Sequence, residues 1–285
     1  MITRQNLRIR DPYVLTDADE GLYYLYGTNH LLGFDVYTSA DLEHWEGPFP
    51  AFRPEAGFWA DRDYWAPEVH RYRGRYYMLA TLKAEGVCRG TQIFVADSPL
   101  GPFRPCGDGP ATPPDWECLD GTLYIDDDGK PWMVFCHEWL QVHDGEMCAV
   151  PLTDSLDAAA GDPVLLFRAS EAPWTVARNT GIDYITDGPF LFRSGRQLLM
   201  MWSSFGRDGY AIGISRSVSG SVQGPWTHDE RMLFGKDGGH GMIFRSLQGE
   251  WMLTFHAPNK GPEERAVFVR LADADPILTA QPIEV

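Results

Sequence analysis

The chain has 285 residues, of which 44% are apolar and 13% aromatic, and its formal net charge is −16 at pH 7. This acidity excludes a protein that binds nucleic acid through a basic face, and it makes an anionic membrane a poor partner. No apolar run reaches the roughly 18 residues that a transmembrane helix needs, so the sequence predicts no membrane span.

The N-terminal residues, MITRQNLRIRDPYVL, contain no apolar targeting core and no cleavage site. We therefore expect a cytoplasmic protein, with a secreted or periplasmic location as the alternative if a signal has been removed. Five cysteines (88, 106, 118, 136 and 148) are scattered without a Cys-x-x-Cys pair, which indicates reduced thiols. Cys136 and Cys148 lie in apolar runs and are expected in the core.

One hairpin pattern recurs five times along the chain. In each copy a glycine stands between two apolar runs, and these glycines are Gly21, Gly74, Gly129, Gly195 and Gly249. Their spacings are 53, 55, 66 and 54 residues. A period near fifty with several strands per unit is typical of a β-propeller, whose blades bury their faces against one another. The sequence therefore predicts an all-β fold, a five-bladed β-propeller, in which residues 1–285 form one domain.

In chain order, blade one is expected at about 9–52, and a long connector follows it at 53–64. Blade two opens at Trp65 and is followed by a second connector at 105–118. Blade three has an extended tail at 152–181, in which only 155–160 has a briefly helical pattern. Blade four starts near Asp187. Blade five ends at 265–271, and residues 272–285 pair with blade one or lie against the body.

A Gly-Pro-aromatic triplet gives a second repeat late in the units. It occurs at 47–49, 101–103 and 224–226, with a degenerate Asp162-Pro163 version in the third unit. Its recurrence at one place in successive units supports the division into blades.

The first strand of each propeller blade lines the central axis, so the starts of these strands converge on one mouth. We expect the converging residues to be Asp11, Glu68, Asp120, Asp187 and His240. Antiparallel pairing brings the ends of the second strands to the same rim, which adds Asn29, His30, Lys83, His137, Glu138, Ser203, Ser204, His256 and Asn259. A single Asp-Pro or Asp-Gly pair is explained by turn chemistry. Recurring carboxylates in one concavity instead indicate groups with separated pKa values, as glycoside hydrolysis requires.

Five short motifs carry a family resemblance over essentially the whole chain. They are Arg10-Asp11-Pro12, the run from Tyr64 to Val69 (YWAPEV), Leu119-Asp120-Gly121-Thr122-Leu123, Asp187-Gly188-Pro189-Phe190 and Gly238-Gly239-His240-Gly241. In this order and spacing they resemble glycoside hydrolase family 43. The resemblance implies a catalytic five-bladed propeller that cleaves arabinosyl, xylosyl or some galactosyl linkages with inversion at the anomeric carbon.

The resemblance also implies roles for individual residues. Asp11 matches the general base that activates water, and Asp120 matches the carboxylate that orients the proton donor and tunes its pKa. The general acid of the family is usually a glutamate before Gly-Pro, whereas this chain has Asp187 there, so its carboxyl lies about 1 Å further from the leaving oxygen. Asp187 is the favoured general acid, and Glu138 on the rim of blade three is the alternative.

His240 matches an axial histidine that in many relatives helps to hold calcium or a similar ion through water. A hydrogen-bonded histidine that plugs the channel is the equal alternative. No cofactor is required for the chemistry, so any ion is expected to be structural.

The expected substrate is an oligosaccharide or polysaccharide of the plant cell-wall type, with α-L-arabinofuranoside or β-D-xyloside linkages. Trp65 and Trp139 are candidate sugar-stacking residues, while Glu68, Lys83 and Asn29 are candidate contacts to sugar hydroxyls. Connectors at 53–64, 105–118 and 168–183 can wall one end of the pocket, which favours exo action. The alternative is a non-catalytic carbohydrate-binding propeller that has lost the usual acid. The sequence gives no oligomeric state.

Overall fold

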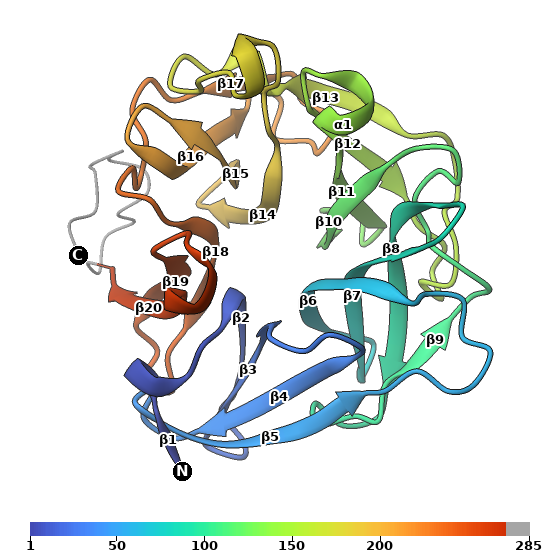
Figure 1. Cartoon of the computed structure of the whole chain (residues 1–285), viewed down its shortest axis with the longest axis vertical. Coiled ribbons are helices and arrows are strands. Elements are labelled where there is room, and N and C mark those ends of the chain that lie inside the picture. The colour runs from blue at the N-terminus through green and yellow to red at the C-terminus, as the bar shows by residue number, and fades with distance from the viewer. Residues whose placement is uncertain (272–285) are drawn as a thin grey trace.

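The computed structural model describes residues 1–271, which form five antiparallel sheets around a central axis (Figure 1). Blade one contains β2 (Arg10–Asp17), β3 (Leu22–Thr28), β4 (Phe34–Ser39) and β5 (His44–Phe52), with β1 (Ile2–Thr3) on β5. Blade two contains β6 (Arg62–Tyr72), β7 (Arg75–Ala84), β8 (Val87–Ala96) and β9 (Arg104–Cys106). Blade three contains β10 (Cys118–Ile125), β11 (Pro131–His137), β12 (Glu146–Pro151) and β13 (Val164–Arg168).

Blade four contains β14 (Asp187–Ser194), β15 (Gln197–Gly206), β16 (Gly209–Ser217) and β17 (Trp226–His228). Blade five has β18 (Gly239–Arg245), β19 (Trp251–Ala257) and β20 (Arg265–Arg270) in the described range. The predicted five-bladed β-propeller is therefore confirmed. The expectation for the tail at 272–285 lies outside the described residues.

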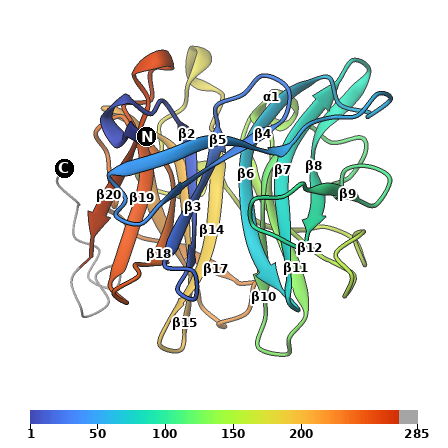
Figure 2. The same ribbon diagram turned by 90° about the horizontal axis from the view of Figure 1, so that it is seen from below.

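The turn glycines explain why the hairpins recur. All five have positive φ values of 67°, 83°, 77°, 57° and 81° in chain order, a region that glycine enters without a steric penalty. The turns between the two inner strands gather at one end of the propeller, shown at the bottom of Figure 2. The opposite end carries α1 (Trp139–Val142) and the ends of the second strands.

Contacts between the N-terminal segment and blade five close the ring. Arg8 forms a backbone bridge with Arg265, and the N–H of Ile9 donates to the carbonyl of Glu264. The buried carboxylate of Glu264 also binds Arg8 at 2.7 Å and Arg10 at 3.0 Å. Blade one is thus joined to blade five by backbone and side-chain bonds before its first inner strand begins.

Aromatic side chains fill the spaces between blades. At the junction of blades three and four, fully buried Trp202 contacts Phe167 and Trp174 at centroid distances of 5.3 and 4.9 Å. Gly213 makes room for this packing, because a Cβ there would lie 2.2 Å from the Trp174 ring. Burial of one large apolar side chain contributes about 1.5–3 kcal/mol, so such junctions supply much of the stability that a single blade lacks.

Helical structure is sparse and differs from the expectation. Besides α1 there are four 3-10 turns in the described range, η1 (Arg4–Asn6), η2 (Ala169–Glu171), η3 (Asn179–Gly181) and η4 (Gly261–Glu263). The predicted helical turn at 155–160 is wrong, since that segment forms bends and a bridge between Leu152 and Ala159. Residues 139–142 form the helix instead, after the second strand of blade three ends.

No helix within residues 1–271 has the length and apolar character needed to cross a bilayer. All five cysteines fall in this range and are unpaired, and Cys136 and Cys148 are buried as predicted.

Candidate active site

Each inner strand contains a β-bulge at the end of the propeller that carries α1. The ladder shifts register between Arg10 and Tyr13, and it does so at the equivalent place in the other four blades. The first residue within each bulge has a positive φ value: Asp11 (52°), Ala66 (44°), Asp120 (55°), Gly188 (50°) and His240 (50°). Non-glycine residues in this region are strained by about 1–3 kcal/mol, and such strain is concentrated at functional sites.

The bulges show how the five residues expected at the mouth are placed along their strands. Asp11, Asp120 and His240 occupy equivalent positions, but Glu68 and Asp187 do not. Glu68 lies two residues after the bulge position of blade two, and Asp187 lies one residue before that of blade four. Convergence of the strand starts on one mouth therefore does not give the five residues equivalent positions, because the exact place of the bulge is not visible in the hairpin repeat.

A cavity of about 440 Å³ lies over the bulges. It is lined by residues at or just before the bulges and by side chains that reach in from neighbouring strands: Arg8, Arg10, Asp11, Thr28, Trp65, Leu119, Asp120, Glu138, Asp187, Tyr210 and His240. The structure thus brings together the predicted base, modulator, both candidate acids and the axial histidine. We call this cavity the carboxylate pocket.

Asp11 is buried among cationic groups. Its Oδ2 accepts a 2.7 Å hydrogen bond from Thr28, and its Oδ1 lies 3.2 Å from His240 Nδ1 and 3.3 Å from Arg10 Nε. Burial opposes ionisation, but the charges of His240 and Arg10 outweigh it and lower the pKa of Asp11 to about 2. Asp11 is therefore a carboxylate at any physiological pH.

His256 contacts the same carboxylate without being charged. Its Nδ1 accepts the backbone N–H of Asp11 at 3.2 Å, which leaves the proton on Nε2, facing Asn259 Oδ1 at 3.2 Å. Burial lowers the pKa of His256 to about 4. The 3.5 Å approach of His256 Nδ1 to Asp11 Oδ1 is therefore not an ion pair.

Asp120 and Asp187 behave as a pair. Burial and the charge of Asp120 raise the pKa of Asp187 to about 7, although Tyr210 donates a 2.9 Å hydrogen bond to its Oδ2. Burial also raises the pKa of Asp120, but His240 and the N–H of Gly188, 3.0 Å from Asp120 Oδ2, favour its carboxylate form. The proton that the pair retains near pH 7 therefore resides on Asp187.

His240 bridges the two ionised carboxylates. Its Nδ1 is 3.2 Å from Asp11 and 3.6 Å from Asp120, and Gly188 allows this approach because a Cβ there would meet the imidazole at 2.7 Å. Burial lowers the pKa of His240, but Asp11 and Asp120 more than offset this, so its pKa is raised. The ring is thus held as a cation between two anions.

The donor set around His240 does not suit direct coordination of an ion. Within residues 1–271 no group of three or more His, Cys, Asp or Glu side chains could hold a metal, and Nδ1 of His240 already faces two carboxylates. The water-mediated axial ion expected from the resemblance stays a prediction, and no catalytic step is derived from it.

Glu138, the alternative acid, is buried at the rim and bound to Arg89. The same guanidinium binds Asp63 at 2.8 Å and lies 4.5 Å above the ring of Trp65. Burial raises the pKa of Glu138 above its ordinary value, and the charge of Arg89 offsets only part of this rise. Glu138 therefore has a direct cationic partner, whereas the hydrogen bond to Asp187 comes from a neutral phenol.

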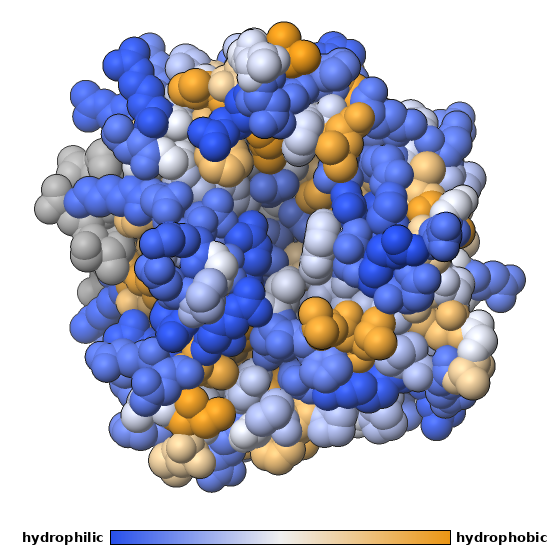
Figure 3. All heavy atoms as spheres, in the orientation of Figure 1, coloured by the Kyte–Doolittle hydropathy of each residue, from blue (hydrophilic) through white to orange (hydrophobic). Residues whose placement is uncertain are grey.

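A second cavity of about 570 Å³ adjoins the carboxylate pocket and shares Arg8, Thr28 and Trp65 with it. Asn29 lines this second cavity and donates to Tyr37 at 3.2 Å, while its Oδ1 is buried without a hydrogen-bond partner in the described structure. Trp65 thus lines both cavities, and Asn29 lines the second. Figure 3 views the end of the propeller that carries α1, where polar residues predominate around the centre and apolar ones form small separate groups.

Three other predicted contacts do not line either cavity. Glu68 accepts hydrogen bonds from Thr122 at 2.6 Å and His70 at 3.1 Å, and Lys83 is paired with Glu117 at 2.6 Å. Trp139 is the first residue of α1 and is half-buried. In this structure Glu68 and Lys83 serve the framework, so their predicted role in binding has no geometric support.

Several pocket residues were not anticipated from the sequence. Arg10 directly precedes Asp11, and Thr28 ends the strand opposite it, so a precise register would have indicated both. Tyr210 comes from the third strand of blade four, where no local pattern connects it with Asp187.

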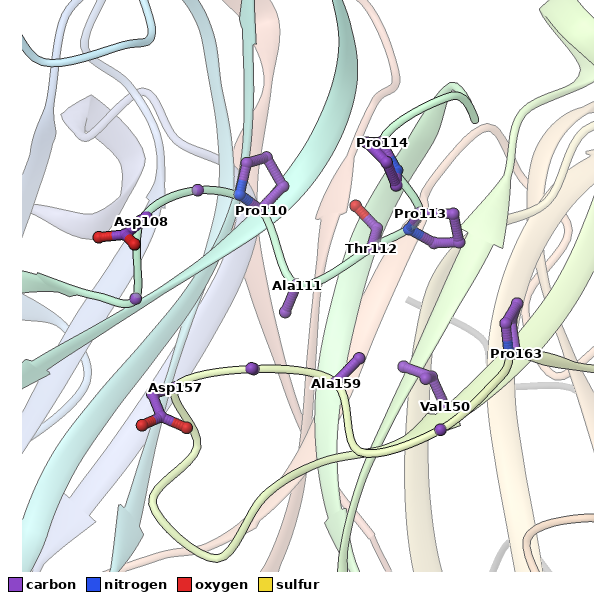
Figure 4. A pocket seen from close by; sticks show the side chains of 14 residues that line it. Asp108, Pro110, Ala111, Thr112, Pro113, Pro114, Val150, Asp157, Ala159 and Pro163 are labelled. Atoms are coloured by element: carbon purple, nitrogen blue, oxygen red, sulfur yellow. The ribbon is translucent and has the colours of Figure 1, made fainter.

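The structure has a larger cavity that lies away from these carboxylates. It has a volume of about 650 Å³ and lies between the 107–114 connector and residues 150–163 of blade three (Figure 4). Its lining consists mainly of glycine, alanine and proline, with Asp108 and Asp157 as the acidic members. Both acidic residues are exposed, and the lining contains no cation and no aromatic ring, so this cavity offers no comparable chemistry.

The carboxylate pocket has the parts that acid–base hydrolysis of a glycosidic bond needs. An ionised Asp11 and a protonated Asp187 face one cavity, and Asp120, which accepts a hydrogen bond from the N–H of Gly188, lines the same cavity. A propeller with such a pocket belongs to the class of glycan-cleaving enzymes rather than to that of protein-interaction propellers.

Comparison with known proteins agrees with this class. Residues 5–276 match the model of glycosyl hydrolases family 43, and the chain belongs to that family. It is 44% identical to a crystal structure of an endo-arabinase from Bacteroides thetaiotaomicron, with a TM-score of 0.91 over 96% of this chain and 98% of the other. A thermostable family-43 glycoside hydrolase is 24% identical, with a TM-score of 0.82 over 97% and 94% of the two chains, and supports the fold.

Curated relatives are more distant. An extracellular exo-α-(1→5)-L-arabinofuranosidase of Cellvibrio japonicus is 25% identical over 74% of this chain and 65% of its own length. A probable arabinan endo-1,5-α-L-arabinosidase of Emericella nidulans is 21% identical over 68% of this chain and 58% of its own length. The chain thus matches less than two thirds of the length of these relatives.

Proposed function

We propose that this chain hydrolyses α-L-arabinofuranosyl linkages in arabinan-type glycans by an inverting mechanism. The observation that carries the proposal is the opposed ionisation of Asp11 and Asp187 around one pocket, with pKa values of about 2 and about 7. One carboxyl is thereby ready to accept a proton while the other still has a proton to donate. Arabinosyl rather than xylosyl specificity is supported by the 44% identical endo-arabinase and by the two curated relatives.

In the proposed reaction Asp11 accepts a proton from a water molecule as the water oxygen attacks the anomeric carbon. The bond between that carbon and the leaving oxygen breaks, and Asp187 protonates the leaving oxygen. Inverting enzymes keep the two carboxyl groups roughly 6.5–9.5 Å apart to make room for the water. The charge of Asp120 favours the protonated form of Asp187 until the proton is transferred, while His240 stabilises the ionised forms of Asp11 and Asp120.

Asp187 is the proposed proton donor and Glu138 the competitor. Arg89 binds the carboxyl of Glu138 directly and offsets part of the rise that burial gives its pKa, so Glu138 suits a hydrogen-bond acceptor for a sugar hydroxyl better than an acid. Asp187 has no cation within ion-pairing distance in the described structure and retains its proton near neutral pH.

Trp65 is the proposed sugar platform. Arg89 covers one side of the indole, and Trp65 lines both the carboxylate pocket and the adjoining cavity. The shared lining supports a cleft that accepts more than one sugar unit. The exo mode expected from the connectors stays a prediction, because the endo-arabinase and the exo-arabinofuranosidase among the relatives point in opposite directions.

Product analysis tests the proposal. The wild-type chain and Asp11→Asn are incubated with linear arabinan, xylan and nitrophenyl α-L-arabinofuranoside and β-D-xyloside. Wild type should release arabinose or arabino-oligosaccharides, and Asp11→Asn should lose at least about a hundredfold in kcat, since the base is removed. Arabinose alone at early times indicates exo action, and a ladder of oligomers indicates endo action. Binding of arabino-oligosaccharides without any product would instead support a non-catalytic propeller.

A further inference from the structure

The backbone N–H groups of the bulges form bonds between blades. A bulge residue leaves its own ladder, so its buried N–H must find an acceptor elsewhere. In four junctions the acceptor is a side chain of the preceding blade: Asp11 donates to His256 (3.2 Å), Ala66 to Thr28, Asp120 to Thr81 and His240 to Ser203 (2.8 Å each). Each blade is thus bonded to the one before it at the level of the carboxylate pocket.

These acceptors occupy one equivalent position. Each is the β-partner of the residue just before the bulge of its own blade: Thr28 opposite Arg10, Thr81 opposite Trp65, Ser203 opposite Asp187 and His256 opposite Gly239. In blade three this position holds Cys136, opposite Leu119. Its sulfur is a weak acceptor, and the N–H of Gly188 donates to Asp120 Oδ2 instead.

The two threonines among the acceptors also place their hydroxyl groups against the proposed catalytic carboxylates. Thr28 accepts the N–H of Ala66 and donates its own proton to Asp11 Oδ2 at 2.7 Å. Thr81 accepts the N–H of Asp120 and lies 3.4 Å from Asp120 Oδ1. A hydroxyl has a single proton, so the incoming N–H forces that proton to point at the carboxylate.

We propose that Thr28 is a positioning residue for the general base, and that Thr81 has the same role for Asp120. The proposal rests on the proposed function of Asp11. Thr28 holds Oδ2 while His240 and Arg10 approach Oδ1, so the rotation of the carboxylate is fixed by contacts from blades one and five. Misalignment of a reacting group by about 1 Å can lower the rate about a hundredfold.

The test compares Thr28→Val with Thr28→Ser. Valine keeps the shape but can neither accept nor donate, whereas serine keeps both bonds. Thr28→Val should lower kcat on nitrophenyl arabinofuranoside at least about tenfold with little change in KM, and Thr28→Ser should recover most of the rate. The matched control is Thr254→Val, which removes a buried hydroxyl that has no hydrogen-bond partner in the described structure, and kcat should be unchanged.

The role is overturned if Thr28→Val keeps kcat within about twofold of wild type, or if Thr28→Ser is as slow as Thr28→Val. Thr81→Val and Thr81→Ser repeat the comparison if Thr28→Val does not fold. Inactive wild-type protein would contradict the proposed function and not this inference. Crystal structures then provide the readout: a turned Asp11 carboxylate in Thr28→Val supports the positioning role, and an unchanged one refutes it.

Discussion

Replacing Asp187 with asparagine tests the assignment of the proton donor. With a pKa of about 7, Asp187 retains its proton at a mildly acidic pH at which an aspartic acid at its ordinary pKa of 3.8 would be ionised. Burial and the charge of Asp120 therefore make the acid available at neutral pH. Because proton donation contributes about 10²–10⁴-fold to a rate, Asp187→Asn should lose a comparable factor on arabinan.

The assay uses two leaving groups. A nitrophenolate leaves without much assistance, so Asp187→Asn should retain far more activity on nitrophenyl arabinofuranoside than on arabino-oligosaccharides. The wild-type kcat/KM should fall above about pH 7, where Asp187 loses its proton, and this basic limb should vanish in the variant.

Glu138→Gln is the matched control for this prediction. The activity of Glu138→Gln should fall by similar factors on both substrates, because this variant removes a binding contact and leaves the proton donor Asp187 in place. The reverse result, with a loss that depends on the leaving group only in Glu138→Gln, would refute the reasoning and make Glu138 the acid.

Three further predictions follow from the same contacts. Asp187 binds its proton more tightly in the folded state than in the unfolded state, so its burial lowers the stability of the fold as the pH rises from about 4 to about 7. Calorimetry should therefore show that Asp187→Asn raises the melting temperature more at pH 8 than at pH 4. Cys136→Ser supplies a hydroxyl that can accept the N–H of Gly188, so Asp120 should lose this donor and the pKa of Asp120 should rise. The acid limb of the kcat/KM profile should then move to higher pH, whereas Cys136→Ala should leave it in place. Trp65→Ala should raise KM for arabino-oligosaccharides about tenfold with a smaller change in kcat, and an unchanged KM in steady-state assays would contradict its role as a platform.

The sequence could predict five blades because the repeat is local. A glycine that needs positive φ between two apolar runs specifies a hairpin within about twenty residues, and five such hairpins at a spacing near fifty can bury their faces only against one another. Asp11, Asp120 and His240 were likewise visible, because each lies in a short motif at the start of an inner strand.

The tertiary structure decided what lies between the blades. The bulge moves Glu68 out of the pocket lining and sets Asp187 one residue before Asp120's equivalent position, although all three begin similar motifs. Tyr210 reaches Asp187 from a third strand, and Arg89 reaches Glu138 from the neighbouring blade. These contacts join residues 23 to 49 positions apart in the sequence. Because the carboxyl groups of Asp187 and Glu138 are buried, each contact strongly affects the pKa of its carboxyl group. The motifs could identify the carboxylates and, through the family resemblance, their expected roles, whereas the physical basis of those roles lies in their surroundings, because a pKa depends on charges and burial that no local pattern records.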